Sequence, residues 1–395
     1  MISCCIWIWI FVISSVCSFS HVDYNIGGTT ANGWEFVRDL FKKNFVEEQD
    51  LGASIALYHQ DKLVVDLWGG WFDRSFTKPY DNHTLQLVFS TSKGVVAIAV
   101  ALCVQKGLLN YSDLVTKYWP EYGQNGKENT TVADILSHRA GVPFDPALIE
   151  QILNWTAMVH SLEQRKQLWP PGTSHSYHGL TYGWLAGELI RRVDPKKRSV
   201  GQFIQDEIAS RLKIEFYIGL PSKEDYRVSP ISHSLDTIQT MNDSLKALYV
   251  FFNEPRLHHA EIPAGNGITN ARSLAKLYAS LITDLDDEKQ KRLLDEAVLK
   301  QAIKSNTPKD EPDFLGTVPL TFSMGFLLLD ETFSFFKSEI FGHSGSSGSI
   351  GFAVPSKNLS FAYVTNQPDM RTTDRTFPRI RTILEKVVTK IRDNY

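Results

Sequence analysis

Apolar residues recur with helical spacing near the start of the chain and then alternate with the spacing of strands. The periodicity predicts an amphipathic helix over 33–48, where apolar positions lie three or four residues apart. Strands are expected over 53–58 and 63–68, joined by a short polar turn. A third strand, over 85–89, leads directly into the polar segment 90–93, and 94–104 then forms a helix that is apolar on every side. A helix of that kind is buried in the core.

The middle of the chain, 110–311, is mostly helical in pattern, and strands return after it. We expect strands over 322–329, 349–354 and 359–364, and a closing helix over 380–392. Strand-rich flanks therefore enclose a helical middle. Consecutive strands joined by short turns indicate an antiparallel sheet covered by helices, so the expected fold class is α+β.

The first twenty residues contain no Asp, Glu, Lys or Arg, and 6–13 are apolar throughout. Small residues follow, a pattern that resembles a secretory signal peptide cleaved after Cys17, Ser18 or Ser20. An uncleaved membrane anchor is the alternative, which the short apolar stretch disfavours because a span needs about 20 residues. We expect a secreted protein, or one in the lumen of the secretory pathway, without a membrane span after cleavage.

The predicted elements also suggest how the mature chain is organised. After a signal peptide over 1–20, we expect one domain over 21–395. Its α/β part covers about 24–108 and 312–395, and its helical part covers about 109–311. No internal repeat interrupts this arrangement.

Composition excludes two classes of protein. The chain of 395 residues has 41 Lys and Arg against 44 Asp and Glu, so it lacks the basic excess of a nucleic-acid binder. A hydrophobic content of 43% with 22% charged residues is that of a globular protein and excludes wholesale disorder. The partner we expect is a small molecule.

Cysteines and glycosylation motifs agree with secretion. Cys4, Cys5 and Cys17 lie in the leader, so Cys103 is alone in the mature chain and cannot form an internal disulfide. Its apolar neighbours indicate a buried structural thiol. Six N-x-S/T motifs are candidate glycan acceptors in a secreted chain: Asn82, Asn110, Asn129, Asn154, Asn242 and Asn358.

The strongest chemical feature is the pair Ser90 and Lys93, at the junction between the predicted strand and the buried helix. Residues three apart share a helix face, so the amine can reach the hydroxyl. Burial without an acid disfavours the ammonium, lowers the lysine pKa and makes a neutral amine base accessible. The alternative is an N-cap serine with an incidental lysine. The same spacing at Ser273 and at Ser334 lies in less suitable contexts.

Two further segments complete a candidate site. Tyr177 ends a loop rich in Pro and Gly over 169–179, where it could line a cleft or belong to the core. The segment 342–348 contains many small residues, which let a substrate approach the backbone and accept its N–H groups.

With these motifs, the chain resembles the serine β-lactamase and penicillin-binding-protein superfamily, in its β-lactamase-related branch of esterases and peptidases. The resemblance covers roughly 30–390 and rests on S-T-S-K at 90–93, on Pro171-Gly172 with Tyr177, and on H-S-G at 343–345 in place of K-T-G. The segment 135–143 also resembles that branch's L-L-S-H-x-S-G-L-P stretch.

The resemblance implies a role for each matching residue. Ser90 would be the acylated nucleophile, Lys93 its general base and Tyr177 a proton relay. His343 would give a hydrogen bond or, if protonated, a charge to the substrate or to Tyr177. The backbone N–H groups of Ser90 and Ser346 would form the oxyanion hole. Ser344 and Gly345 would contact the substrate beside it.

Departures from the family pattern bear on the substrate. The Asn that often follows the tyrosine by two positions is Gly179 here, and His343 lacks the permanent charge of Lys. Both favour ester, amide or peptide-like substrates over β-lactams.

Other classes of protein fit less well. The run 342–346 fails the G-x-S-x-G pattern of α/β-hydrolases. His258, His259, His175 and His178 lack metal-binding spacing, so we expect no metal and no cofactor. The main alternative is an inactive protein of the same fold that acts by binding.

Overall fold

A computed structural model describes the protein over 24–47, 49–144, 149–233, 243–285, 289–309, 311–316, 320–369 and 377–392. The expected signal peptide, with its three cysteines, and the motif at Asn242 lie outside the described residues.

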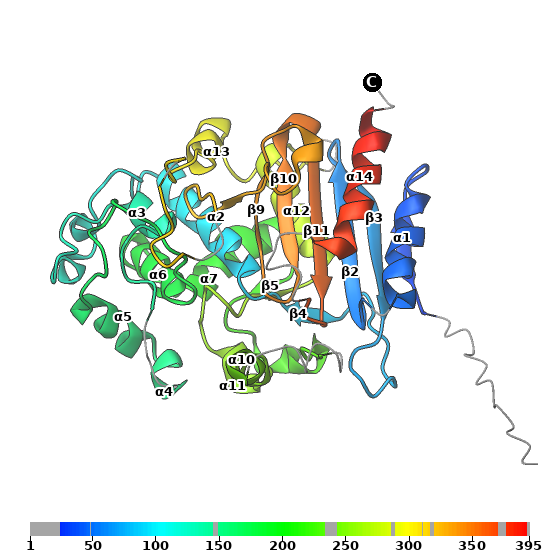
Figure 1. The fold of residues 1–395 in the computed structure, drawn as a ribbon, viewed down its shortest axis with the longest axis horizontal. Coiled ribbons are helices and arrows are strands. Elements are labelled where there is room, and N and C mark those ends of the chain that lie inside the picture. Colours follow the sequence, from blue (N-terminus) through cyan, green and yellow to red (C-terminus); the bar gives the residue numbers. More distant parts are fainter. Residues whose placement is uncertain are drawn as a thin grey trace, which may run out of the picture.

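An antiparallel sheet forms the centre of the molecule, with strand order β1-β3-β2-β11-β10-β9-β8 (Figure 1). Predicted strands over 53–58, 63–68, 349–354 and 359–364 are confirmed as β2, β3, β10 and β11. The strands are β1 Gly27–Thr30, β2 Gly52–His59, β3 Lys62–Gly70, β8 Leu327–Leu328, β9 Phe341–Ser344, β10 Ile350–Val354 and β11 Leu359–Thr365. The expected antiparallel α+β fold is therefore confirmed.

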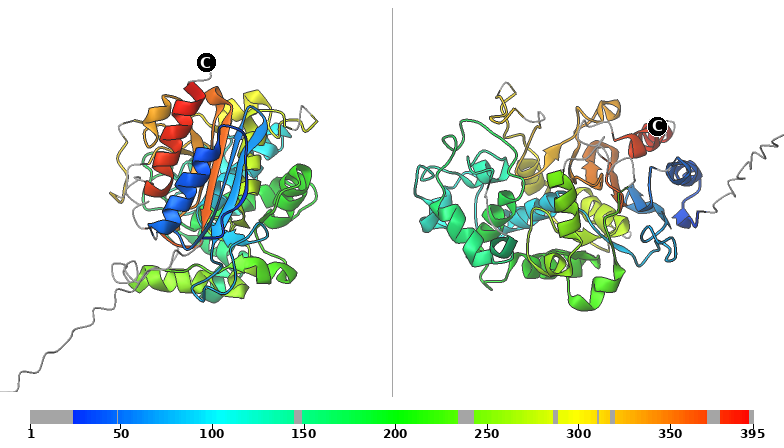
Figure 2. Two further views of the ribbon diagram at one scale, coloured as in Figure 1. Left: turned by 90° about the vertical axis from the view of Figure 1, so that its right-hand side faces the viewer. Right: turned by 60° about the horizontal axis from the view of Figure 1, so that its bottom comes forward.

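Helices cover both faces of this sheet. The first and last helices, α1 (Glu35–Val46) and α14 (Pro378–Arg392), lie side by side over one face (Figure 2). Their apolar residues, such as Phe41 and Leu384, join a core with the sheet. On the other face, α12 (Ala271–Ile282) packs against β2, β10 and β11. Both ends of the chain therefore stabilise the strands on which part of the site is built.

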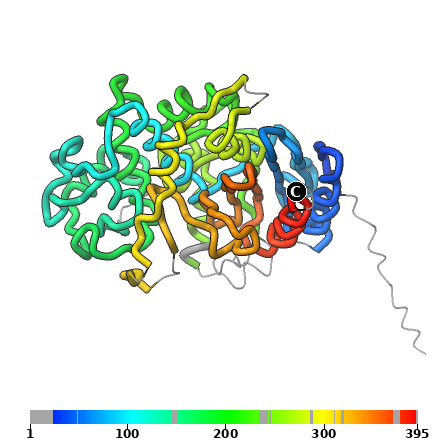
Figure 3. Tube along the Cα trace, turned by 90° about the horizontal axis from the view of Figure 1, so that it is seen from above, coloured from blue at the N-terminus to red at the C-terminus, as the bar shows by residue number. Residues whose placement is uncertain are grey.

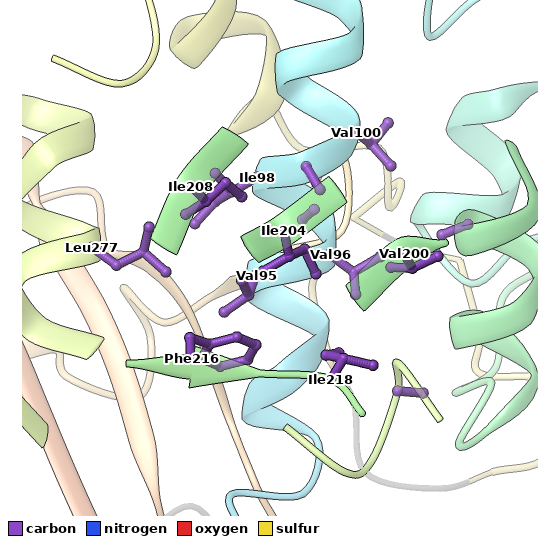
Figure 4. Packing of buried hydrophobic residues seen from close by; sticks show 14 of the residues in the cluster. Val95, Val96, Ile98, Val100, Val200, Ile204, Ile208, Phe216, Ile218 and Leu277 are labelled. Atoms are coloured by element: carbon purple, nitrogen blue, oxygen red, sulfur yellow. The ribbon is translucent and has the colours of Figure 1, made fainter. Parts of the chain in front are cut away.

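The central helix α2 (Thr91–Gln105) confirms the predicted buried helix and begins three residues earlier than expected. Every residue from Thr91 to Cys103 is buried, including Lys93. Figure 4 shows its apolar side chains against those of neighbouring helices and a strand. Cys103 is a buried free thiol, as predicted.

The predicted strand over 85–89 is wrong in its length and in its partners. The strand β4 (Leu85–Leu87) belongs to a second, small sheet of order β5-β7-β4-β6, where β4 and β6 run parallel. The other strands are β5 Phe216–Tyr217, β6 Val228–Ser229 and β7 Ile268–Thr269. The middle of the chain therefore supplies strands as well as helices.

Only Leu327–Leu328 of the predicted strand over 322–329 forms a strand, β8. The preceding residues turn back, with Ser323 donating its N–H to the Phe326 carbonyl. Gly325 has a φ of 98°, and a Cβ there would lie 2.4 Å from the Tyr182 hydroxyl. This close approach to the buried helices bends the segment and ends the strand.

The helical part of the fold lies at the opposite end of the molecule from α1 and α14 (Figure 3). Among the described helices, none combines the length and the apolar character needed to cross a bilayer. The remaining helices are α3 Val132–Leu136, α4 Ile149–Ile152, α5 Trp155–Gln164, α6 Thr181–Val193, α7 Val200–Ile204, α8 Ser210–Leu212, α10 Asp243–Phe252, α11 Pro255–His259 and α13 Glu296–Ala302. Short helical turns are η1 Val115–Lys117, η2 Pro120–Tyr122, η3 Gln205–Ala209, η4 Ser222–Arg227, η5 Ser334–Phe336 and η6 Pro355–Lys357.

Candidate active site

Ser90 lies at the first turn of α2, at the end of the short connection from β4. Its backbone is already helical, with φ −63° and ψ −12°, and its side chain makes no N-cap hydrogen bond. Instead, Ser90 Oγ lies 3.1 Å from Lys93 Nζ. The hydroxyl is therefore directed towards the lysine, which is not the arrangement of a simple N-cap serine.

The residue before Ser90 reverses the direction of the chain. Phe89 has a φ of 47°, an uncommon conformation for a bulky residue. Its buried ring packs edge-on against Tyr249 and Phe252, with centroids 5.2 and 5.3 Å away. These aromatic contacts hold the strained turn that places Ser90 at the helix start.

Lys93 Nζ is completely enclosed and is held by two backbone carbonyls. The distances are 2.7 Å to Gly179 O and 2.9 Å to Ala264 O. No carboxylate in the described part of the chain forms an ion pair with it, and burial lowers the pKa of Lys93 well below its usual value. A neutral amine has two N–H bonds and one lone pair. When the carbonyls accept both N–H bonds, the lone pair faces Ser90 Oγ.

Tyr177 stands against both members of this pair. Lys93 Nζ lies 4.8 Å from the centre of its ring, and its hydroxyl is close enough to Ser90 for the serine to lower the pKa of the phenol slightly. Burial raises the pKa of Tyr177, so the phenol is neutral at ordinary pH. The hydroxyl can accept a proton from one side and donate its own on the other, as a relay requires.

His138, which the sequence left uncertain, supports the loop that carries Tyr177. Its carbonyl accepts the N–H of Ser176 at 3.1 Å, and its Nδ1 accepts the N–H of His178 at 3.0 Å. Its ring centroid lies 4.9 Å from that of Tyr177. The two hydrogen bonds therefore lie on either side of Tyr177. The motif at 135–143 contains this residue and is the signal from which the sequence could have identified it.

His343 lies on β9, which pairs with β10. Its Nδ1 donates to the Ser344 carbonyl at 2.8 Å, so the lone pair is on Nε2. That atom is buried and has no partner among the described residues. Burial, reinforced by Lys93, lowers the pKa of His343 to about 3. His343 is therefore a neutral hydrogen-bond acceptor near Tyr177, with 6.4 Å between ring centroids, and not a cation.

The turn after β9 is fitted tightly beside the start of α2. A Cβ on Gly345 would lie only 2.2 Å from the Val88 carbonyl oxygen, so no other residue fits without a shift. Thr91 Oγ1 donates to the Ser349 carbonyl at 3.0 Å and joins the two segments. Ser346 follows Gly345, and its carbonyl accepts the Tyr249 hydroxyl at 3.0 Å.

Two backbone N–H groups remain available at this junction. Within the described ranges, neither Ser90 N–H nor Ser346 N–H donates to another group of the protein. Both residues line the same cavity. This is the arrangement that the predicted oxyanion hole requires.

A cavity of about 590 Å³ opens beside Ser90. All the predicted site residues border it except Lys93, which lies behind Ser90 and Tyr177. Among the residues that the structure describes, none of those lining it is Asp, Glu, Lys or Arg. The residues are Ser90, Pro143, Phe144, Ile152, Met158, Ser176, Tyr177, Gly179, Leu180, Thr181, Trp184, Leu315, Leu320, Leu327, Leu328, Leu329, Thr332, His343, Ser344, Gly345, Ser346 and Phe377.

The other candidate motifs do not join this cavity. Ser273 lies in the first turns of α12, where its hydroxyl accepts the Glu215 N–H at 3.0 Å. Ser334 lies in the helical turn η5. His175 and His258 are buried packing residues, as expected: His175 contacts Glu311, and His258 contacts the Phe252 carbonyl. In the described part of the chain, no three His, Cys, Asp or Glu residues are grouped as a metal site would need.

Comparison with known proteins places this geometry in context. The family model described as Beta-lactamase matches residues 37–384. "Esterase/beta-lactamase LipL" of Mycobacterium tuberculosis is 29% identical over 343 residues, which is 80% of this chain and 77% of the relative.

Solved structures agree with the sequence relatives. A family VIII carboxylesterase superposes with a TM-score of 0.79 at 30% identity, covering 90% of this chain and 99% of its own. A penicillin-binding protein homolog from Caulobacter crescentus has a TM-score of 0.79 at 31% identity, covering 91% and 99%.

The geometry of His343 leads to a test of its charge. Because its pKa is lowered, the folded protein should keep this imidazole neutral, with the proton on Nδ1, between about pH 5 and pH 8, where free histidine titrates. Two-dimensional NMR of ¹⁵N-histidine-labelled protein measures the charge and the tautomer, and the spectrum of His343→Gln identifies the signal. A His343 signal that titrates within this range would contradict the neutral assignment.

Proposed function

Since this chain belongs to the Beta-lactamase family and is a serine hydrolase, we propose that it cleaves carboxylic esters through an acyl-enzyme formed on Ser90. The observation that carries the proposal is the buried Lys93 amine, whose Nζ lies 3.1 Å from Ser90 Oγ and within hydrogen-bond distance of two backbone carbonyls. A serine is a weak nucleophile until a base takes its proton, and this amine is placed to do so.

In the acylation step, Lys93 Nζ accepts the Ser90 proton while Oγ attacks the ester carbonyl. The carbonyl oxygen becomes negative and accepts hydrogen bonds from the N–H groups of Ser90 and Ser346. When the tetrahedral intermediate collapses, the C–O bond to the alcohol breaks. The proton passes through the Tyr177 hydroxyl to the departing alcohol oxygen, which leaves as a neutral alcohol.

Deacylation repeats these events with water as the nucleophile. Tyr177 and Lys93 together accept a proton from water as its oxygen attacks the acyl carbonyl. The bond to Ser90 Oγ then breaks, and Oγ recovers its proton from Lys93. The products are a carboxylic acid and the original enzyme.

An uncharged ester suits this site better than a substrate with an obligate carboxylate. The described lining residues include no Lys or Arg, and the lowered pKa of His343 keeps that residue neutral. A carboxylate would lose its hydration without gaining a partner. The names of the relatives, an esterase/β-lactamase and a carboxylesterase, support the same choice.

Two substitutions test the proposed nucleophile and base. Ser90→Ala removes the acylated oxygen, and Lys93→Met removes the lone pair while keeping an apolar side chain of similar length. Each should lower kcat for p-nitrophenyl butyrate by about 10³-fold or more. Intact mass after treatment with a fluorophosphonate measures acylation directly: wild type should gain one adduct, Ser90→Ala none, and Lys93→Met should react slowly.

The second S-x-x-K sequence offers a matched control. Lys276→Ala, on α12, should leave both the rate and the adduct unchanged. Full activity in folded Ser90→Ala protein would overturn the proposal.

We also propose that the chain enters the secretory pathway and carries N-linked glycans. The apolar leader supports this, and so does the surface position of four candidate acceptors. In the structure, Asn82, Asn110, Asn129 and Asn154 are exposed. Asn154 caps α5 through Oδ1, which leaves Nδ2 free to carry a glycan.

Expression of the full chain in a eukaryotic secretory host tests this. Protein recovered from the medium should lose mass on treatment with a peptide N-glycosidase, and Asn110→Gln with Asn129→Gln should reduce the loss. An unglycosylated protein retained inside the cell would contradict the proposal.

A further inference from the structure

The cavity beside Ser90 is larger and more apolar than the reaction itself requires. Its volume of about 590 Å³ falls within the range of sites that enclose a small-molecule ligand. An ester group alone occupies little of this space. The rest of the cavity therefore belongs to another part of the substrate.

Two apolar walls face this space. One comes from the helical part of the fold and includes Ile152 at the end of α4, Met158 on α5 and Trp184 on α6. The other comes from β8 and from the residue before α14, and it includes Leu327 and Phe377. Because the described residues of both walls carry no charge, a charged group would be desolvated against them without compensation.

We propose that this cavity binds the acyl part of the substrate, and that the natural acyl group is uncharged, apolar and several carbons long. The inference rests on the proposed function, and it adds the substrate class. The acyl group remains on Ser90 between the two steps, whereas the alcohol must leave the site before water attacks. An apolar cavity beside Ser90 suits the part that stays.

A series of p-nitrophenyl esters from acetate to decanoate measures the preference for chain length. The value of kcat/KM should rise roughly two- to fourfold for each added methylene until the chain fills the cavity. Acids with a terminal carboxylate, such as the p-nitrophenyl monoester of adipate, should be poor substrates. A profile that is highest at acetate and falls with length would overturn the inference and leave the esterase proposal intact.

Adjacent residues provide a matched pair of variants. Ile152 lines the cavity, whereas its partly buried neighbour Leu153 does not. Ile152→Trp should therefore lower the ratio of kcat/KM for octanoate to kcat/KM for acetate on the order of tenfold. Leu153→Trp should leave this ratio unchanged. Equal effects of the two variants on the ratio of octanoate to acetate would contradict an acyl site at Ile152.

Binding without turnover separates this inference from the proposed function. Calorimetry with Ser90→Ala protein should show that N-octanoylaniline binds at least about tenfold more tightly than N-acetylaniline. Such a preference together with no ester hydrolysis by wild type would refute the reaction and retain the cavity assignment. Equal binding of the two amides would refute the cavity assignment.

A second inference comes from a different observation, the contacts of His138. This residue is fully buried, has a φ of 64°, and leaves its Nε2 without a partner among the described residues. Since Nδ1 accepts a backbone N–H, Nε2 carries the proton and is a buried donor that packing alone would not retain. The hydrogen bonds of its carbonyl and of Nδ1 hold Ser176 and His178, the residues before and after Tyr177.

We infer that His138 is a positioning residue that fixes the Tyr177 hydroxyl against Ser90. Its ring also packs on Phe322 and Tyr182, at 4.3 and 5.2 Å between centroids, so the imidazole is held by contacts with two further segments. A loop supported at both neighbours of one side chain leaves that side chain little freedom. Displacing the tyrosine by about 1 Å is enough to cost on the order of 100-fold in rate.

Three substitutions at this position separate the hydrogen bond from backbone strain. Asn tolerates the left-handed conformation, and its Oδ1 can accept the His178 N–H, so His138→Asn should keep most of the activity. His138→Gly also suits the backbone but lacks the acceptor, and it should lose roughly 10- to 100-fold in kcat, as should His138→Ala. Thermal unfolding of each variant reports whether the fold is retained. An Asn variant as impaired as the Gly variant would refute the role of the acceptor.

A double-mutant cycle with Tyr177→Phe tests whether His138 acts through the tyrosine. If it does, His138→Gly should cost less than about twofold once the Tyr177 hydroxyl is absent. A merely structural role would lower kcat by the same factor in both backgrounds, and that result would overturn the inference.

Discussion

The burial of Lys93 without a carboxylate is the constraint on which the rest of the site depends. Its amine is held by carbonyls of Gly179 and Ala264, which lie 86 and 171 residues along the chain. The loop before α6 and the segment before β7 must therefore meet behind α2 for the lysine to be satisfied. An ammonium in this position would lack an opposite charge, so the neutral amine is the form that the fold favours. The packing of three segments that are distant in the sequence therefore also produces the neutral amine that activates Ser90.

Close approach between α2 and β9 brings the two halves of the site together, and glycines make it possible. A Cβ on Gly94 would lie 2.3 Å from the Tyr278 hydroxyl and 3.3 Å from the Cβ of His343. On the other side of the contact, Gly345 lies against the Val88 carbonyl. Larger residues at either position would push the strand away from the helix. Ser346 and Ser90 would then no longer border one cavity, and their N–H groups could not serve one oxyanion.

Features governed by local pattern could be predicted from the sequence, and features governed by tertiary contact could not. The apolar run after Ser90 indicated a buried helix and a lysine of lowered pKa, because both follow from residues within one or two turns. By contrast, β4 left the expected sheet for a second one, and the predicted strand at 322–329 was cut short where Gly325 packs against buried helices. The charge of His343 stayed open until its burial was known, and the role of His138 depends on a hydrogen bond across 40 residues.

The same physical cause links the chemistry of the site to its choice of substrate. Exclusion of water lowers the pKa of Lys93 and of His343, and it also makes the cavity unfavourable for a charged group. A cationic side chain that could bind a substrate carboxylate would lie near Lys93 and Tyr177 and change the field in which the amine stays neutral. An apolar acyl group has the opposite effect, because it displaces water from the cavity without introducing charge. Filling the cavity therefore stabilises the neutral amine of Lys93. Because that amine activates Ser90, binding of the acyl group favours activation of the nucleophile.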